Sequence, residues 1–147
     1  VKLEGPRFDE IQAITSEGIA VVAHLGLTPQ TATNWKQAAK KTDEQEKLIS
    51  DALKVQAAGA SILVLEHIPS ELAQKVSETL SIPTIGIGAG RHTDGQVLVL
   101  HDMLGISEKT PPIAKAFNHL KGPIFDSFKE YHQWVKEGCI DHPTELD

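Results

Sequence analysis

The sequence is poor in cysteine, in long apolar runs and in basic residues, and each shortage excludes a class of protein. Its single cysteine, Cys139, cannot form an internal disulfide, so we expect a reduced, cytoplasmic protein. No apolar run approaches the roughly 18 residues of a membrane-spanning helix, and none resembles the core of a signal peptide. With 14 Lys and Arg against 20 Asp and Glu, the formal net charge of −6 disfavours nucleic acid or an anionic membrane as a partner. A small molecule is therefore the expected ligand.

The composition that remains is typical of one soluble globular domain. Hydrophobic residues make up 40% and charged residues 23% of the 147 positions, which excludes disordered and fibrous chains. A chain of this length can bury about two thirds of the surface that it exposes when unfolded. A sizeable core is therefore expected.

Apolar runs and helical periodicities alternate along the chain. Five short apolar runs, nearly continuous rather than strictly alternating, predict strands of a parallel sheet over Val1–Glu4, Ala20–Leu25, Ser61–Glu66, Thr84–Ala89 and Gln96–Leu100. Apolar residues at helical spacing predict helices over Phe8–Glu17, Asp43–Ala58 and Ser70–Leu80. These helices end at Gly18, at Gly59 and before Pro83, which are ordinary helix terminators. The alternation predicts the α/β class.

The sequence changes character in its last third. Pro111 and Pro112 interrupt the alternation, and two terminal helices are predicted over Ile113–Leu120 and Phe125–Val135, followed by a frayed tail at His142–Asp147. We therefore divide the chain into a β/α region over 1–110 that carries the candidate site, and terminal helices and tail of the same domain over 111–147. Because Val1 opens directly on a strand, we expect the chain to be part of something larger.

Charged and polar residues gather where the predicted strands end. Lys2 and Glu4 are two positions apart on one strand and therefore share a face, while His24 and Glu66 end two further strands. The carboxyl ends of parallel strands form the active sites of β/α proteins, so these residues are candidates for a common site. The alternative for each one alone is an ordinary solvated residue at the start of a loop. Glu66 closes an apolar run and is expected at the rim of an apolar cavity, where burial raises the pKa of a carboxyl group and suits a general base.

Other motifs give weaker signals. Asp102 is predicted to end the last strand, as a cap or as a partner of His101. The glycine-rich run over Thr84–Gly90 could hold a phosphate or carboxylate against backbone amides, but tight packing at a barrel corner explains it equally well. The remaining histidines have no tetrahedral metal spacing, and neither Ser61 nor Cys139 has a base to activate it as a nucleophile.

Several motifs in one order resemble a known enzyme family. Together they resemble the 3-methyl-2-oxobutanoate hydroxymethyltransferases, the ketopantoate-forming enzymes of pantothenate synthesis, from residue 1 to about Ile106. The motifs are Val1–Gly5, His24–Gln30, Leu63–Glu66, Ile82–Gly90 and Asp94–Asp102. The combination is far more specific than any of its parts.

The resemblance implies a fold and a reaction. The fold is a (β/α)8 TIM barrel of the phosphoenolpyruvate mutase and isocitrate lyase type, of which this chain would hold about the last five β/α strands. The protein would be a homo-oligomer, usually a decamer, and would bind Mg²⁺. In the reaction, 3-methyl-2-oxobutanoate is deprotonated beside its carbonyl group, and the enolate attacks the one-carbon unit of 5,10-methylenetetrahydrofolate to give 2-dehydropantoate (ketopantoate).

The resemblance also implies roles for the strand-end residues. Glu66 matches the proton acceptor of the family, Lys2 matches its contact to the 2-oxo acid, Glu4 matches its metal-site carboxylate, and His24 matches a histidine of the substrate site. Two departures matter: no serine and aspartates of the first half of the barrel are present, and the loop over 31–41 differs from the family and is shorter. Two alternatives therefore stay open, namely another Mg²⁺-dependent 2-oxo acid lyase or mutase of the superfamily, and a non-catalytic half-barrel that serves as a paralogue or assembly partner.

Overall fold

The computed structural model describes residues 1–138 and divides into two compact units. The first spans Val1–Val97 and the second begins at Leu98. The expected tail over His142–Asp147 and the single cysteine, Cys139, lie outside the described residues. Among the helices of residues 1–138, none combines the length and the apolar character needed to cross a membrane.

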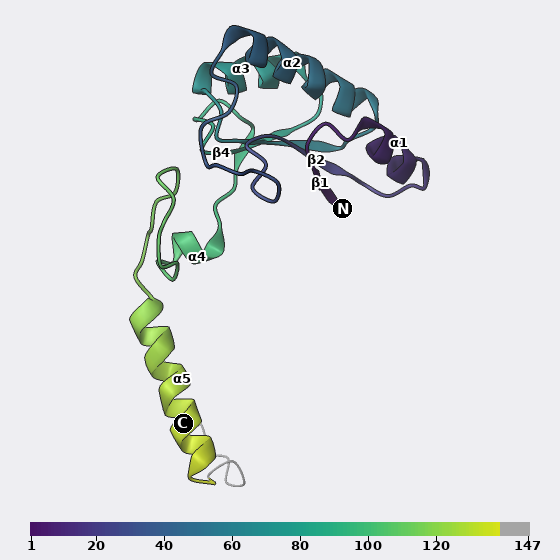
Figure 1. Ribbon diagram of the computed structural model, residues 1–147. Coiled ribbons are helices and arrows are strands. Elements are labelled where there is room, and N and C mark those ends of the chain that lie inside the picture. Colours follow the sequence, from purple (N-terminus) through teal and green to yellow (C-terminus); the bar gives the residue numbers. More distant parts are fainter. Residues whose placement is uncertain (139–147) are drawn as a thin grey trace. The chain divides into compact units, whose positions relative to one another are not determined.

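A parallel sheet of five strands forms the centre of the first unit (Figure 1). Every neighbouring pair is parallel, and the strands lie in the sheet in the order in which they occur in the chain. The strands are β1 (Lys2–Glu4), β2 (Val22–Gly26), β3 (Ile62–Glu66), β4 (Thr84–Ile87) and β5 (Gly95–Gln96). The predicted α/β class is confirmed, and the sheet is consistent with part of a TIM barrel.

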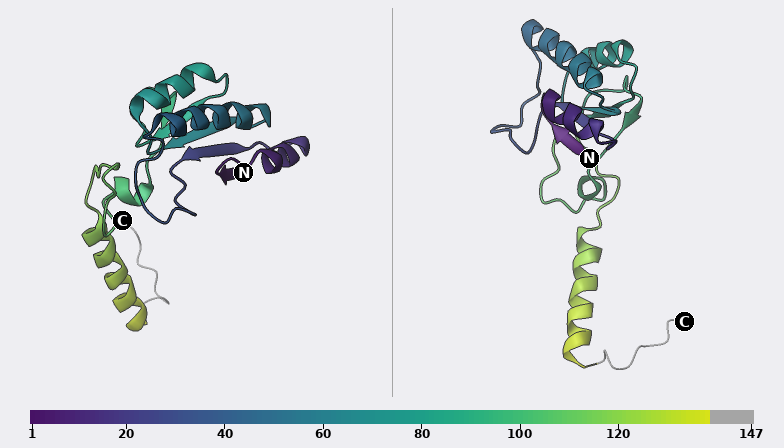
Figure 2. Two further views of the ribbon diagram at one scale, coloured as in Figure 1. Left: turned by 45° about the horizontal axis from the view of Figure 1, so that its top comes forward. Right: turned by 90° about the vertical axis from the view of Figure 1, so that its right-hand side faces the viewer.

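Three helices connect the first four strands. They are α1 (Phe8–Ser16), α2 (Thr42–Ala57) and α3 (Ser70–Thr79). Right-handed crossovers between neighbouring parallel strands put successive helices on the same face of a sheet. Figures 1 and 2 show α2 and α3 together over one face. The predicted terminators are confirmed, since Gly18 and Gly59 follow α1 and α2 with φ of 75° and 99°, a conformation that favours glycine.

The core fills the space between the sheet and these helices. Alternate residues of β2 and β3, namely Ala23, Leu25, Leu63 and Leu65, point into it. They meet the apolar faces of the helices, which contribute Ile11, Ala52, Val55, Leu72 and Val76, all of them 2% exposed or less. The apolar periodicity of the sequence thus marks the helix surfaces that bury against the sheet.

The structure corrects two predictions for the end of the chain. The apolar run predicted as a strand over Gln96–Leu100 supplies only Gln96 to β5, and Leu100 begins the short helix α4 (Leu100–Met103). The helix predicted over Ile113–Leu120 is absent, and α5 (Lys121–Lys136) begins four residues before the predicted Phe125. The first turn of α5 contains Pro123, which is tolerated because backbone N–H groups there have no partner within the helix.

One glycine controls the approach of β2 to the end of β3. Gly26 has a φ of +98°, and a Cβ atom added there would lie 2.3 Å from the carbonyl oxygen of Glu66. We expect Gly26→Ala to lower the free energy of unfolding by about 1 to 2 kcal/mol through backbone strain, with about 1 to 3 kcal/mol more from overpacking.

Gly18→Ala is the matched control, because Gly18 also has a positive φ, +75°, but has open space around it. Urea denaturation of the two variants separates the contributions. Equal losses of stability in both would show that the contact with Glu66 adds nothing beyond backbone strain.

Candidate active site

The four strand-end residues lie on the face of the sheet opposite the helices. Side chains alternate between faces along a strand. Because Leu3 packs against the core, while Ala23 and Leu63 belong to it, the alternate positions Lys2, Glu4, His24 and Glu66 point to the other face. The sequence prediction that Lys2 and Glu4 share a face is confirmed.

The strand register brings these residues together across three neighbouring strands. Glu4 of β1 pairs with His24 of β2, and Gly26 of β2 pairs with Glu66 of β3. His24 lies between the two carboxylates: its Nδ1 is 3.6 Å from Oε1 of Glu4, and its Nε2 is 3.3 Å from Oε2 of Glu66. Lys2 places its Nζ 3.8 Å from the same Glu4 oxygen. The structure therefore assembles all four predicted site residues into one cluster.

Burial distinguishes the members of this cluster. His24 is 1% exposed and Glu66 is 7% exposed, whereas the side chain of Lys2 keeps 47% of its surface accessible. The ammonium group of Lys2 is thus the cluster's most accessible charge. Glu66 and His24 are held behind it, within the sheet surface.

The environment of Glu66 favours its protonated form. Burial raises the pKa of the Glu66 carboxyl group above its ordinary value, the neighbouring Glu4 carboxylate raises it further, and the Lys2 ammonium partly offsets both. Such a group accepts a proton more readily than an exposed glutamate does. The expected upward direction is confirmed, although the nearest groups on this face are charged and polar rather than the apolar rim that we expected.

His24 is fixed by two hydrogen bonds. Its Nδ1 lies 2.8 Å from Nζ of Lys2, and its Nε2 lies 2.8 Å from the backbone oxygen of Leu27. Burial and the nearby Lys2 ammonium lower the pKa of His24 below its ordinary value, against the weaker opposing effects of Glu4 and the Leu27 carbonyl. The imidazole is therefore neutral at pH 7.

Two backbone groups that could not be predicted from the sequence also belong to the site. The carbonyl of Leu27 anchors His24, and the N–H of Gln30 donates a hydrogen bond of 3.2 Å to Oε2 of Glu4. Backbone groups leave no signature in the residue types, so only the path of the chain after β2 reveals them.

The described residues do not by themselves form a metal site. Across 1–138, no group of three or more His, Cys, Asp or Glu side chains is arranged to hold a metal ion. Glu4, the expected metal-site carboxylate, already contacts Lys2, His24 and the N–H of Gln30. Mg²⁺ keeps several waters and is usually held by one or two carboxylates together with substrate oxygens. Glu4 could therefore supply one ligand, and any further protein ligand would have to come from outside the described residues.

The weaker motifs have structural roles. Asp102 does not end a strand: it lies inside α4, where its Oδ1 accepts a hydrogen bond of 2.6 Å from Ser107 rather than pairing with His101. In the glycine-rich run, a Cβ at Gly86 would lie 2.6 Å from Oγ1 of Thr93, and one at Gly90 would lie 2.1 Å from Oγ of Ser70. These close approaches favour the packing interpretation of the run.

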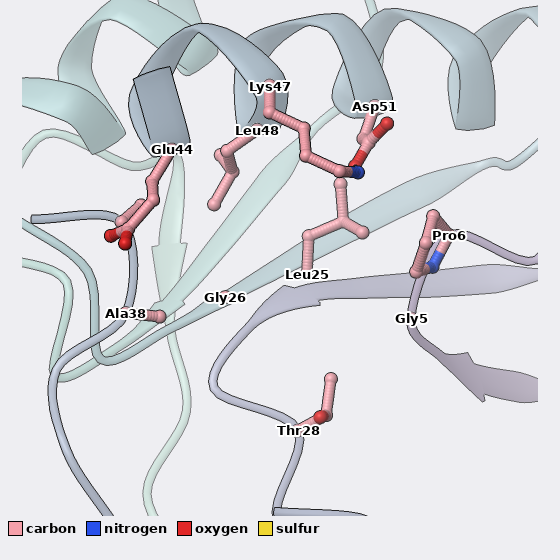
Figure 3. A pocket seen from close by; sticks show the side chains of 11 residues that line it. Gly5, Pro6, Leu25, Gly26, Thr28, Ala38, Glu44, Lys47, Leu48 and Asp51 are labelled. Carbon is pink, nitrogen blue, oxygen red and sulfur yellow. The ribbon is translucent and has the colours of Figure 1, made fainter. Parts of the chain in front are cut away.

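A separate pocket lies between the ends of β1 and β2 and the start of α2 (Figure 3). It has a volume of about 230 Å³, and Gly5, Leu25 and Leu48 are among the residues that line it. Its charged groups are already paired, since Lys47 binds Asp51 and Glu44 accepts hydrogen bonds from the N–H groups of Lys40 and Lys41. None of the four clustered residues lines this pocket.

The raised pKa of Glu66 predicts a pH-dependent gain of stability in Glu66→Gln. Ionising Glu66 costs more free energy in the folded chain than in the unfolded chain. The resulting loss of folding stability is absent at pH values below the pKa of Glu66 in the unfolded chain, about 4.3. It grows as the pH rises through the pKa of Glu66 in the folded chain. We expect Glu66→Gln to raise the melting temperature at pH 7 and to change it little at pH 4.

Glu46→Gln, at an exposed position of α2, is the control and should give no such dependence. Thermal melts of both variants at the two pH values make the comparison. A Glu66→Gln variant that is less stable at pH 7 than at pH 4, relative to the parent, would contradict the raised pKa.

Comparison with known proteins places the chain in a family. The family model for ketopantoate hydroxymethyltransferase matches residues 1–144. A protein of Rippkaea orientalis named 3-methyl-2-oxobutanoate hydroxymethyltransferase is 47% identical over 143 residues, covering 94% of this chain and 56% of the relative. Proteins with the same name from Geobacter sulfurreducens and Haloarcula marismortui are 48% and 47% identical, covering 99% and 94% of this chain and 56% and 53% of the relatives. The chain spans about half the length of the curated relatives that it matches. It belongs to the ketopantoate hydroxymethyltransferase family.

Proposed function

We propose that this chain supplies the base and a substrate-binding cation for hydroxymethyl transfer from 5,10-methylenetetrahydrofolate to 3-methyl-2-oxobutanoate, which gives ketopantoate. The observation that supports it best is the buried Glu66 carboxyl group with a raised pKa, in one cluster with the accessible Lys2 ammonium. The relatives, which carry the name of this activity, support the same substrate.

The cluster suits the chemistry of the first step. The carboxylate of Glu66 takes the proton from the carbon beside the keto group, and the electrons of the broken C–H bond pass into an enolate. The ammonium of Lys2 pairs with the anionic 2-oxo acid and balances the charge that develops as the enolate forms. A neutral His24 adds no competing positive charge beside the base.

The second step joins the enolate carbon to the one-carbon unit of the folate. A C–C bond and a C–O bond form at the methylene carbon as its two C–N bonds to the folate break. Water supplies the hydroxyl group, and the two folate nitrogens take up one proton from water and the proton that Glu66 removed, which releases tetrahydrofolate. Among the described residues only Glu4 would face the Mg²⁺ that the family resemblance implies. The same proposal includes assembly into a homo-oligomer, which is usually a decamer in the family, and a location in the cytoplasm.

Product analysis on the natural protein tests the proposed reaction. We expect ketopantoate, identified by NMR, from a mixture of 3-methyl-2-oxobutanoate and 5,10-methylenetetrahydrofolate, with Glu46→Gln as an active control. Other 2-oxo acids, offered in parallel, address the lyase and mutase alternative. Carbon–carbon cleavage of another 2-oxo acid, without ketopantoate formation, would overturn the proposal, and so would a protein that binds neither substrate.

A further inference from the structure

We propose that His24 does not touch the substrate but positions the Lys2 ammonium that does, through a neutral imidazole whose two nitrogen atoms are both used inside the protein. This inference rests on the proposed function for its substrate. It changes the role expected for His24 from a substrate contact to a positioning residue.

The hydrogen-bond partners of His24 fix its tautomer. A backbone carbonyl only accepts hydrogen bonds, so Nε2, which lies 2.8 Å from the oxygen of Leu27, must carry the ring proton. A lysine ammonium only donates, so Nδ1, which lies 2.8 Å from Nζ of Lys2, must present its lone pair. The ring is therefore the Nε2–H form, and no free donor or acceptor remains on it.

Burial supports the same conclusion. His24 is 1% exposed, so a ligand that reaches the accessible Lys2 does not reach the ring nitrogens. The Lys2 ammonium has three N–H groups: one points to Nδ1 of His24, and a second faces Glu4 at 3.8 Å. The third is left for the substrate anion. The bond to His24 thus fixes the position of an ammonium whose side chain stays 47% accessible to a ligand.

The Leu27 carbonyl connects this arrangement to the chain beyond β2. Leu27 also donates its own N–H to the backbone oxygen of Glu66, at 2.8 Å. The same residue thus holds the ring that orients the cation and the strand end that carries the base. One residue after β2 therefore contacts both the ring beside the cation and the strand that carries the base.

Two substitutions of His24 distinguish the roles of its two ring nitrogens. His24→Asn keeps an acceptor near the position of Nδ1, whereas His24→Gln keeps a donor near the position of Nε2. If His24 acts through Lys2, calorimetric titration with 3-methyl-2-oxobutanoate alone should show an affinity loss of about tenfold for His24→Gln. His24→Asn should restore most of it. Equal losses in both variants would overturn the proposal.

A double-mutant cycle with Lys2→Met tests whether the effect passes through lysine. In the Lys2→Met background, His24→Gln should weaken binding of the 2-oxo acid by no more than about twofold, because no ammonium remains to be oriented. In the parent, His24→Gln should raise KM more than it lowers kcat. A tenfold loss of affinity in both backgrounds would show that His24 contacts the substrate directly.

The tautomer can be measured without substrate and without changing His24. Long-range ¹H–¹⁵N correlation spectra of the parent should show His24 as a neutral ring protonated at Nε2, with an Nδ1 signal that moves in Lys2→Met. A ring protonated at Nδ1 in the parent, or an Nδ1 signal unaffected by Lys2→Met, would refute the inference, and neither measurement depends on the His24 variants being folded. Ketopantoate formation is measured separately, and its absence would refute the proposed function. The NMR spectra would still test the role of His24 in that case.

Discussion

Replacing Glu66 by glutamine is expected to slow removal of the proton beside the keto group of 3-methyl-2-oxobutanoate by about 10²- to 10⁴-fold. Glutamine keeps the size of the side chain but cannot accept the proton. The 2-oxo acid should still bind, because the substitution leaves Lys2, the proposed partner of its carboxylate, in place. Exchange of this proton into deuterated water, followed by NMR without folate, measures the step apart from one-carbon transfer.

The control for this experiment is Glu46→Gln, which removes one carboxylate from the exposed surface of α2. It should exchange at the rate of the parent. If Glu66→Gln also exchanges at the parental rate while hydroxymethyl transfer is lost, Glu66 serves the folate half of the reaction, and the assignment of the base is wrong.

Replacing Lys2 by methionine is expected to weaken binding of the 2-oxo acid by about ten- to a hundredfold. Methionine keeps most of the side-chain volume and removes the ammonium, whose remaining N–H group is the proposed contact to the substrate anion. Binding of the folate should change much less, because the proposed partner of the lost charge is the 2-oxo acid alone. Calorimetric titration with each ligand gives the two affinities.

Lys75→Met, at an exposed position of α3, is the matched control for a lost lysine charge and should leave both affinities unchanged. Equal weakening of both ligands in Lys2→Met, with a lower melting temperature, would show that Lys2 maintains the fold instead of binding the substrate.

The first four strands and the first three helices could be predicted from the sequence, because the apolar residues that define their patterns are the residues that the structure buries. Leu63 and Leu65 are in the core, as the apolar run of β3 indicates. The run from Val97 to Leu100 is equally apolar, yet Val97, Val99 and Leu100 are about half exposed, and Leu100 starts a helix. A short apolar run does not by itself distinguish a strand from other local structure, and most side chains of this run are not buried as those of β3 are.

That the four site residues lie close together could be predicted, because the strand ends and the alternation of side chains along each strand determine it. The contacts among the four side chains could not be predicted. Lys2 and Glu66 are 64 positions apart, and their proximity follows from the parallel register of β1, β2 and β3. The pairing of His24 with Lys2 depends on side-chain reach and on the position of the Leu27 carbonyl, which no residue pattern encodes. The roles of the four side chains in catalysis stay predictions.

The agreement between strand order in the sheet and strand order in the chain bears on how this segment folds during synthesis. Each new strand pairs with the one made just before it, so the sheet can grow one edge at a time without waiting for a distant partner. All four residues of the cluster have emerged from the ribosome once Glu66 has emerged, before β4 and β5 do. Within this segment, the strands that carry the cluster are thus available for pairing before the strands that extend the sheet.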